Sequence, residues 1–166
     1  MMTRSRLVAA LFAVPLTIAT GSNAMAATAT TTFPVTATVI KACVVSATPL
    51  AFGNYDPTAS SPNDATSTLS VLCTVGTSYT VGLTQGTASG ATVTTRKMSN
   101  GANLLNYALY QETGRTTNWG NTPSTDTVAA TAPVGATTLT VYGRIAAGQN
   151  VPIGSYSDTI TVNVVY

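Results

Sequence analysis

The sequence predicts an all-β protein, a single immunoglobulin-like β-sandwich of seven or eight strands. No segment repeats its apolar residues with the 3.6-residue period of a helix. Short runs instead alternate apolar and polar residues, as strands with one buried face do. Glycine, proline and threonine recur between these runs at the spacing of sandwich turns. We find no internal repeat and no separate linker, so we expect one domain.

The chain begins as a secretory signal peptide does. Arg4 and Arg6 precede the apolar run Leu7–Ile18, and Ala24-Met25-Ala26 forms a small-x-small cleavage site. We expect removal of residues 1–26, and no later segment approaches the length of a transmembrane helix. We therefore predict a secreted protein with no stable membrane insertion.

The stretch Ala27–Ile40 is the first strand of the processed chain and carries neither charge nor glycine. Phe33, Val35, Ala37 and Val39 fall on one side of an extended chain, opposite Pro34, Thr36 and Thr38. The stretch spans roughly 45 Å if extended, longer than one sandwich strand needs. Such a strand at a free terminus normally promotes aggregation. We interpret it as a segment that completes the sheet of another copy.

The remaining elements follow from alternation and turn residues. Ser67–Cys73 and Leu104–Gln111 alternate most clearly, whereas Thr92–Met98 is polar and fits an edge strand. Two long polar stretches, Asp56–Ala65 and Thr113–Ala136, are predicted loops, the second with one short strand near Thr127–Ala129. In order, the expected extended segments of the domain 41–166 are Cys43–Ala47, Pro49–Tyr55, Ser67–Cys73, Tyr79–Leu83, Thr92–Met98, Leu104–Gln111, Thr137–Ile145 and Ser157–Tyr166.

The charge of the processed chain is balanced. The full chain has 7 basic and 5 acidic residues, and loss of Arg4 and Arg6 leaves 5 of each. Such a charge-poor chain gives no support to nucleic-acid binding, and its surface does little to keep copies apart.

Cys43 and Cys73 are the only cysteines, and the chain has no histidine. In an exported protein such a pair predicts a disulfide, and two cysteines alone make no structural zinc site. Without histidine, a nucleophile motif or an activated cysteine, we expect neither an enzyme nor a cofactor or metal site.

Four patches together closely resemble the spore coat protein U domain, which also forms subunits of archaic, Csu-type chaperone–usher pili. They are TTTFPVTATV before Cys43, PLAFGNYDP at 49–57, the pair LSVLCTVGTSYTVGL and LNYALYQ, and the terminal stretch Thr138–Tyr166. The last patch is the most specific, with Tyr142-Gly143-Arg144, Gly148-Gln149 and Gly154-x-Tyr156-x-Asp158-Thr159.

The resemblance implies an incomplete immunoglobulin-like sandwich that lacks its last strand. A periplasmic chaperone would fill the resulting apolar groove, and at an outer-membrane usher the N-terminal strand of the next subunit would replace it. We predict Phe33, Val35, Ala37 and Val39 as the donor side chains, although Thr28–Thr32 could share the role. The acceptor groove should be edged by Ser157–Tyr166, with Ile160, Val162, Val164 and Tyr166. Alternatively, all of Ala27–Ile40 pairs within its own sheet.

Other candidate sites each have an ordinary structural interpretation. Arg144 could pair with Asp158. Trp119 with Tyr110 and Arg115 could bind sugar, although a lone loop tryptophan more often caps a sandwich. Asp56 and Asp64 could ligate calcium, but two carboxylates are weak support.

Three functions compete. The first is a pilin that polymerises into a surface fibre for adhesion and biofilm formation, with other copies, a chaperone and an usher as partners. The second is a monomeric carbohydrate-binding module, and the third is the coat protein of a spore or cyst. The uncharged leading strand favours the pilin.

Overall fold

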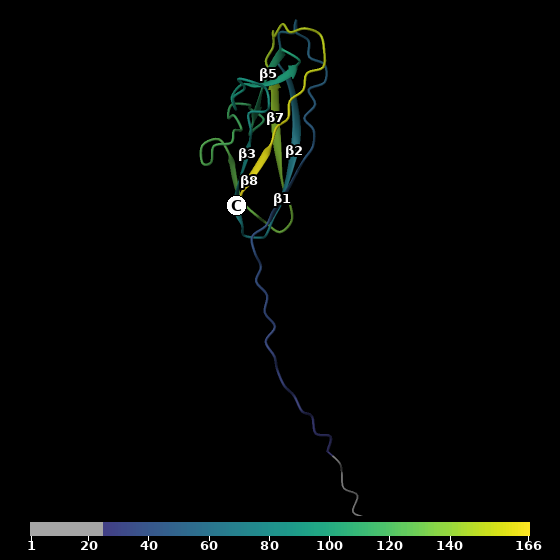
Figure 1. Cartoon of the computed structure of the whole chain (residues 1–166), viewed down its shortest axis with the longest axis vertical. Helices are drawn as coiled ribbons and strands as arrows, with labels where there is room; N and C mark the ends of the chain where they lie inside the picture. Colours follow the sequence, from purple (N-terminus) through teal and green to yellow (C-terminus); the bar gives the residue numbers. More distant parts are fainter. Residues whose placement is uncertain (1–24) are drawn as a thin grey trace, which may run out of the picture. The chain divides into compact units, whose positions relative to one another are not determined.

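The computed structural model describes residues 25–166 and divides the chain into two units, Met1–Ala37 and Thr38–Tyr166. The predicted signal peptide lies almost wholly outside the described residues. The described part of the first unit, residues 25–37, has no regular secondary structure, and its side chains are exposed. The second unit is an all-β sandwich, as predicted (Figure 1). The described residues contain no helix that could cross a membrane.

The sandwich consists of two antiparallel sheets. The five-stranded sheet has the order β1-β2-β7-β5-β4, and the three-stranded sheet has the order β6-β3-β8. The strand bounds are β1 Cys43–Ala47, β2 Asn63–Cys73, β3 Ser78–Leu83, β4 Arg96–Asn100, β5 Asn103–Tyr110, β6 Val128–Thr131, β7 Thr137–Ile145 and β8 Val162–Val165.

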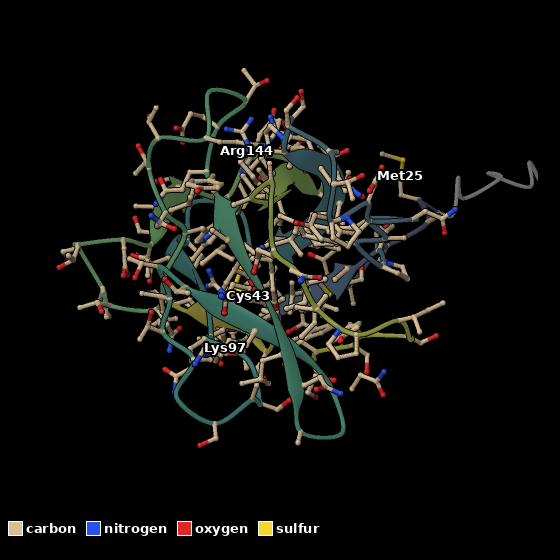
Figure 2. The ribbon with its side chains drawn as sticks, turned by 90° about the horizontal axis from the view of Figure 1, so that it is seen from above. Met25, Cys43, Lys97 and Arg144 are labelled. Carbon is tan, nitrogen blue, oxygen red and sulfur yellow. A yellow bond between two sulfur atoms is a disulfide. The ribbon has the colours of Figure 1, made fainter. Side chains whose placement is uncertain are left out.

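The core lies between the sheets and consists of the inward-facing residues of the alternating strands. Figure 2 shows the side chains of the described residues on the ribbon, seen from above. β3 contributes Tyr79, Val81 and Leu83, and β5 contributes Leu105, Tyr107 and Leu109, as their period of two predicts. The other buried apolar residues are Leu69, Val71, Cys73, Ala108, Trp119, Ala132, Val141 and Ile145.

Three expected elements differ from the structure. β2 begins at Asn63, inside the predicted loop, because residues 63–71 pair with β7 along nine positions. Pro49–Tyr55 forms no strand, since the carbonyls of Phe52 and Asn54 accept hydrogen bonds from the Asn63 side chain instead of from a neighbouring strand. The polar edge strand is Arg96–Asn100, which begins four residues and ends two residues later than the expected Thr92–Met98, and it is at the sheet edge as predicted.

The last strand is also shorter than the predicted Ser157–Tyr166. Ser157 forms a bridge with Ser99 of β4, which belongs to the five-stranded sheet, whereas Val162 pairs with Leu83 of β3 in the other sheet. The chain therefore crosses from one sheet to the other between these residues, and only Val162–Val165 pair as a strand.

Candidate functional site

The strand order shows which position of an immunoglobulin-like sandwich is empty. Such a domain pairs strands A, B, E and D in one sheet and C, F and G in the other. Here β1-β2-β7-β5 follows the order A-B-E-D, and β3-β8 corresponds to C-F. In the part of the chain that the structure describes, no strand occupies the G position beside β8. The sandwich is therefore incomplete at that edge.

The free edge of β8 presents a defined set of main-chain groups. Leu83 donates its N–H to the carbonyl of Gly120, and Thr84 donates to Thr161. Leu83 and its partner Val162 thus form a non-hydrogen-bonded pair in the β3–β8 ladder. Because hydrogen-bonding direction alternates along a strand, Val162 and Val164 point their N–H and C=O groups toward the free edge. These are also the residues whose side chains pack against the core.

A cavity of about 410 Å³ opens beside this edge. One wall is the segment containing Leu50 and Phe52, and the other is the approach to β8, including Ile160 and Val162. Its base contains buried side chains of both sheets: Leu69, Leu83, Leu109 and Val141. An apolar cavity next to unpaired main-chain groups suits an added strand that alternates apolar side chains.

The structure brings three of the four predicted groove-edge residues together. Ile160, Val162 and Val164 are half-buried and pack on the core. Tyr166 lies one residue beyond β8 and is 53% exposed. The role of all four as an acceptor edge stays a prediction.

The predicted donor side chains are available to a partner. Phe33, Val35 and Val39 are 79%, 85% and 83% exposed, and Ala37 is also exposed. No residue of 25–42 belongs to a strand. Their role as donor residues likewise stays a prediction.

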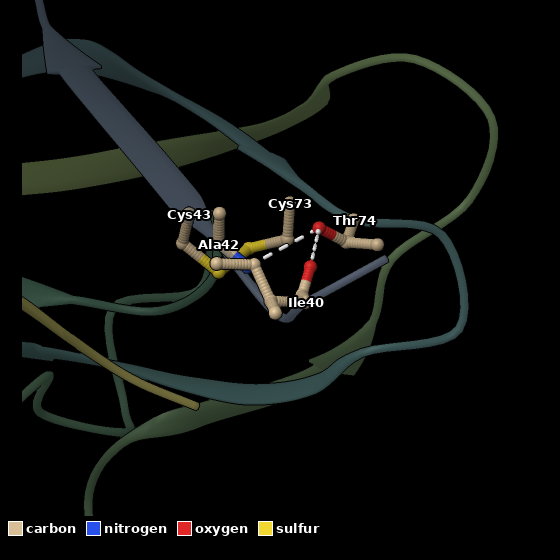
Figure 3. Close-up of a disulfide and its surroundings, with 5 residues drawn as sticks. All are labelled: Ile40, Ala42, Cys43, Cys73 and Thr74. Atoms are coloured by element: carbon tan, nitrogen blue, oxygen red, sulfur yellow. Dashed lines mark hydrogen bonds between the residues drawn. A yellow bond between two sulfur atoms is a disulfide. The ribbon is translucent and has the colours of Figure 1, made fainter. Parts of the chain in front are cut away.

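The disulfide fixes the point where this segment joins the sandwich. Cys43 and Cys73 are bonded, at directly opposed positions of β1 and β2. Thr74 holds the preceding residues: its hydroxyl donates to the carbonyl of Ile40 at 3.1 Å and accepts the N–H of Ala42 at 3.1 Å (Figure 3). The Thr74 N–H also donates to the carbonyl of Ala42 at 2.9 Å. The chain therefore leaves the sandwich at the end where β1 begins.

Asp158 lines the cavity and binds Tyr107 and Thr87 there; Arg144 is not among its partners. Its carboxylate accepts the Tyr107 hydroxyl at 2.7 Å and the N–H and hydroxyl of Thr87 at 2.8 and 2.9 Å. Burial raises the pKa of Tyr107, and the bond to Asp158 raises it further. Gly86 has a φ of +92° and lies so close to Asp158 that a side chain there would collide with it.

The predicted pair of Arg144 with Asp158 is wrong. Arg144 binds Asp64 with two hydrogen bonds of 2.8 Å, since β2 and β7 place these residues opposite each other. Arg115 adds a contact of 3.4 Å to the same carboxylate. The hydrogen bond from Arg144 lowers the pKa of Asp64, and Arg115 lowers it further.

The possible sugar patch around Trp119 is not formed. Trp119 is only 1% exposed and donates its indole N–H to the carbonyl of Val81 at 2.9 Å. It packs in the core, so its ring face is not free to stack on a sugar. Arg115 instead lies over the ring of Tyr142, at 5.6 Å from its centroid.

Asp56 and Asp64, the possible calcium ligands, bind different partners. Asp56 accepts hydrogen bonds from the N–H and hydroxyl of Thr58, whereas Asp64 binds the two arginines. Among the described residues, no group of three or more histidine, cysteine or acidic side chains could hold a metal ion.

Sequence reasoning missed the role of Arg96. Its side chain is fully buried and donates to the carbonyls of Thr84, Val93, Leu83 and Trp119 at 2.6–3.0 Å. Burial lowers its pKa to about 10, against the raising effect of Tyr107 and Asp158. A single arginine in a polar stretch carries no sequence signal for this role.

The Spore Coat Protein U domain family matches residues 29–163, which include the leading segment and nearly the whole sandwich. The chain belongs to this family. Protein U of Myxococcus xanthus is 37% identical over 164 residues, covering 87% of this chain and 89% of Protein U. The predicted family is thus confirmed, and membership makes this spore coat U domain a structural protein rather than an enzyme.

A solved structure agrees with this assignment. One chain of the crystal structure of the CsuC–CsuE chaperone–tip adhesion subunit pre-assembly complex, from the archaic chaperone–usher Csu pili of Acinetobacter baumannii, matches with a TM-score of 0.59 and 25% identity. The match covers 78% of the present chain but only 40% of that chain. The spore coat U domain therefore shares its fold with a protein of the Csu system.

Proposed function

We propose that this protein is a structural subunit that polymerises into a surface fibre by strand donation. Residues 27–40 of one copy enter the groove beside β8 of another and take the empty G position. One observation carries the proposal: the free edge of β8 adjoins an apolar cavity, and the same chain has an exposed segment of alternating apolar residues.

The energetics favour a long-lived joint. Burying Phe33, Val35 and Val39 contributes roughly 1.5–3 kcal/mol for each side chain that becomes fully buried. Each main-chain hydrogen bond to β8 adds about 1 kcal/mol net. Withdrawal of the donor segment from the groove would break all of these contacts together, so dissociation is slow.

The Csu likeness supports the assembly partners that we propose. A periplasmic chaperone would cover the groove until the subunit reaches an outer-membrane usher, where the donor segment of the next subunit replaces the chaperone strand. The fibre would then stand on the cell surface and serve adhesion and biofilm formation. Co-purification of a stoichiometric chaperone from the periplasm tests this route.

Phe33→Asp tests strand donation directly. A charge at this position cannot enter an apolar groove without a large desolvation cost, so this variant should not polymerise alone. It keeps its own groove, however, and should accept a wild-type strand. Small amounts mixed into wild-type protein should therefore shorten fibres, measured by electron microscopy. Thr38→Ser is the matched control in the same segment and should leave fibre length unchanged; equal fibres from all three proteins contradict the proposal.

A coat protein of a dormant cell is the second candidate, favoured by the 37% identity with Protein U. Both functions use the same joint, so polymerisation does not separate them. Chaperone and usher genes adjacent to the gene, together with immunogold labelling of surface fibres, support the pilus. Labelling confined to the coat of a spore or cyst supports the coat.

A further inference from the structure

The direction in which a segment enters the groove decides which of its residues can bond to β8. Val162 and Val164 face the core and also point their N–H and C=O groups to the free edge. In an antiparallel pair, directly opposed residues share a face, and a residue whose N–H and C=O groups point to the partner strand exchanges both hydrogen bonds with the residue opposite it. In a parallel pair, the donor residue beside Val162 points its N–H and C=O groups away from β8. The donor residues before and after it, whose side chains face outward, then make the hydrogen bonds to Val162. Antiparallel entry therefore uses inward-facing residues, and parallel entry uses outward-facing ones.

The two directions of entry differ in their hydrogen bonding at Pro34, because proline has no N–H to donate. When Phe33, Val35, Ala37 and Val39 face the groove, Pro34 faces outward. In antiparallel entry its missing N–H lies on the side away from β8, and the ladder is complete. In parallel entry the ladder loses a bond at Pro34. Shifting the segment by one residue restores that bond but turns the apolar side chains to solvent and the threonines inward.

A chain that seals its own groove must use parallel entry. β8 ends at Val165, opposite Thr80, near the turn that follows Cys73. This is the end of the sandwich at which Cys43 begins β1. If the leading segment folded back from Cys43 along its own β8, its first residues would lie at the opposite end of the sandwich. From N- to C-terminus it would then run toward the Cys43 end, as β8 does, so the two strands would be parallel.

Antiparallel entry instead requires another copy. Val39 of the donor then lies near the start of β8, so the body of the donor lies at the end of the acceptor opposite to Cys43. The acceptor's own segment leaves at the other end and remains free for a third copy. Such a head-to-tail contact does not close on itself and generates an open fibre.

We propose that Pro34 is a specificity-determining residue that prevents the chain from capping its own groove and so keeps the leading segment available to another copy. The inference rests on the proposed strand donation. It assigns to Pro34 a role that does not depend on filling the cavity, since its side chain faces away from it.

The test moves the proline along the segment of the full processed chain, residues 27–166. Pro34→Ala restores an N–H and should raise the fraction of self-capped monomer by about threefold to tenfold, the effect of one restored hydrogen bond. Adding Thr36→Pro to Pro34→Ala returns a proline to an outward position and should restore wild-type behaviour. Thr36→Ala alone is the matched control and should behave as wild type.

The readouts are the monomer fraction after refolding from denaturant, by size-exclusion chromatography with light scattering, and energy transfer between dyes at Thr28→Cys and Ile153→Cys. Ile153 is fully exposed and adjoins a cavity lined by Leu105 and Ile145, at the end of the sandwich away from Cys43. Transfer within one monomer therefore reports self-capping.

A second position shift, Pro34→Ala with Val35→Pro, places the missing N–H toward β8 in antiparallel entry. This variant should polymerise less than its matched control, Pro34→Ala with Val35→Ala.

The outcomes separate this inference from the proposed function. Wild-type protein that polymerises through its leading segment, together with a monomer fraction unchanged by Pro34→Ala, overturns the role of Pro34 alone. Wild-type protein whose polymerisation is insensitive to Phe33→Asp overturns both. A monomer fraction that rises with Pro34→Ala and falls again with Thr36→Pro supports both.

Discussion

Arg96 uses its guanidinium to hold together segments that no strand pairing joins. Its four carbonyl acceptors lie at the end of β3, in the loop before β4 and at Trp119. A buried guanidinium loses hydration, which is the cause of its lowered pKa. The hydrogen bonds offset that cost only while the whole set is in place.

Replacing Arg96 by methionine should therefore destabilise the sandwich by about 3–5 kcal/mol, because buried carbonyls lose their donors. Urea denaturation followed by Trp119 fluorescence measures the change, in the Phe33→Asp background that removes the proposed strand donation. Lys97→Met, at the next position of β4, is the control and should cost less than about 1 kcal/mol. Equal stability of the two variants contradicts this role for Arg96.

Asp64 makes a smaller, pH-dependent contribution. Its pKa in the folded protein is lowered from the ordinary value of 3.8 by Arg144 and Arg115. Stabilisation from a lowered carboxyl pKa is complete above the unfolded value and is lost as the pH falls through the folded value. Since the pair is partly exposed, we expect Asp64→Asn to cost about 0.5–1 kcal/mol at pH 6. The difference between the two denaturation curves should shrink as the pH falls below 3.8; a difference that does not change between pH 6 and pH 3 requires another cause.

The strands were predictable where alternation is strong and much less so where single side chains decide. The inward residues of β3 and β5 follow from period two, and the Cys43–Cys73 bond follows from the cysteine count. By contrast, the side-chain amide of Asn63 binds two carbonyls of Pro49–Tyr55, which pairs with no strand. The crossing between Ser157 and Val162 depends on partners more than 50 residues away. Local sequence does not contain those partners.

The same limit applies to the groove. Val162 and Val164 were identified from alternation, but the empty position beside β8 is a property of strand order rather than of any one strand. The sequence resemblance supplied that expectation. Sequence spacing alone does not give the pairing of β2 with β7, so it does not predict that Arg144 binds Asp64 rather than Asp158.

The disulfide should stabilise the β1 edge through its 30-residue separation. Chain entropy gives about 3.5 kcal/mol for a loop of this size. β1 pairs with β2 alone among the described strands, so no second neighbour compensates when the bond is lost. We expect the double variant Cys43→Ala with Cys73→Ala to lose about this amount in urea denaturation. A loss below about 1 kcal/mol would show that pairing with β2 alone holds β1.

At the scale of the molecule, filling the groove should raise the stability of the sandwich. The isolated chain leaves the β8 edge unpaired and several apolar side chains of its leading segment in water. The proposed donation would pair the β8 edge and bury these side chains together, so the sandwich in a fibre should be far more stable than the same sandwich alone. In the proposed fibre each subunit would be both donor and acceptor, so the gain would apply to every subunit except at the ends of the fibre.

Calorimetry of fibres and of Phe33→Asp monomer should show this difference. Even two or three buried donor side chains give a gain of about 5 kcal/mol, which for a domain of this size corresponds to a rise in Tm of roughly 10–20 °C. Adding a peptide of residues 27–40 to the monomer should recover much of the rise, and the same peptide with Phe33→Asp should recover little. A monomer that melts with the fibre would mean that its groove is already closed, and strand donation would then have no free energy to supply.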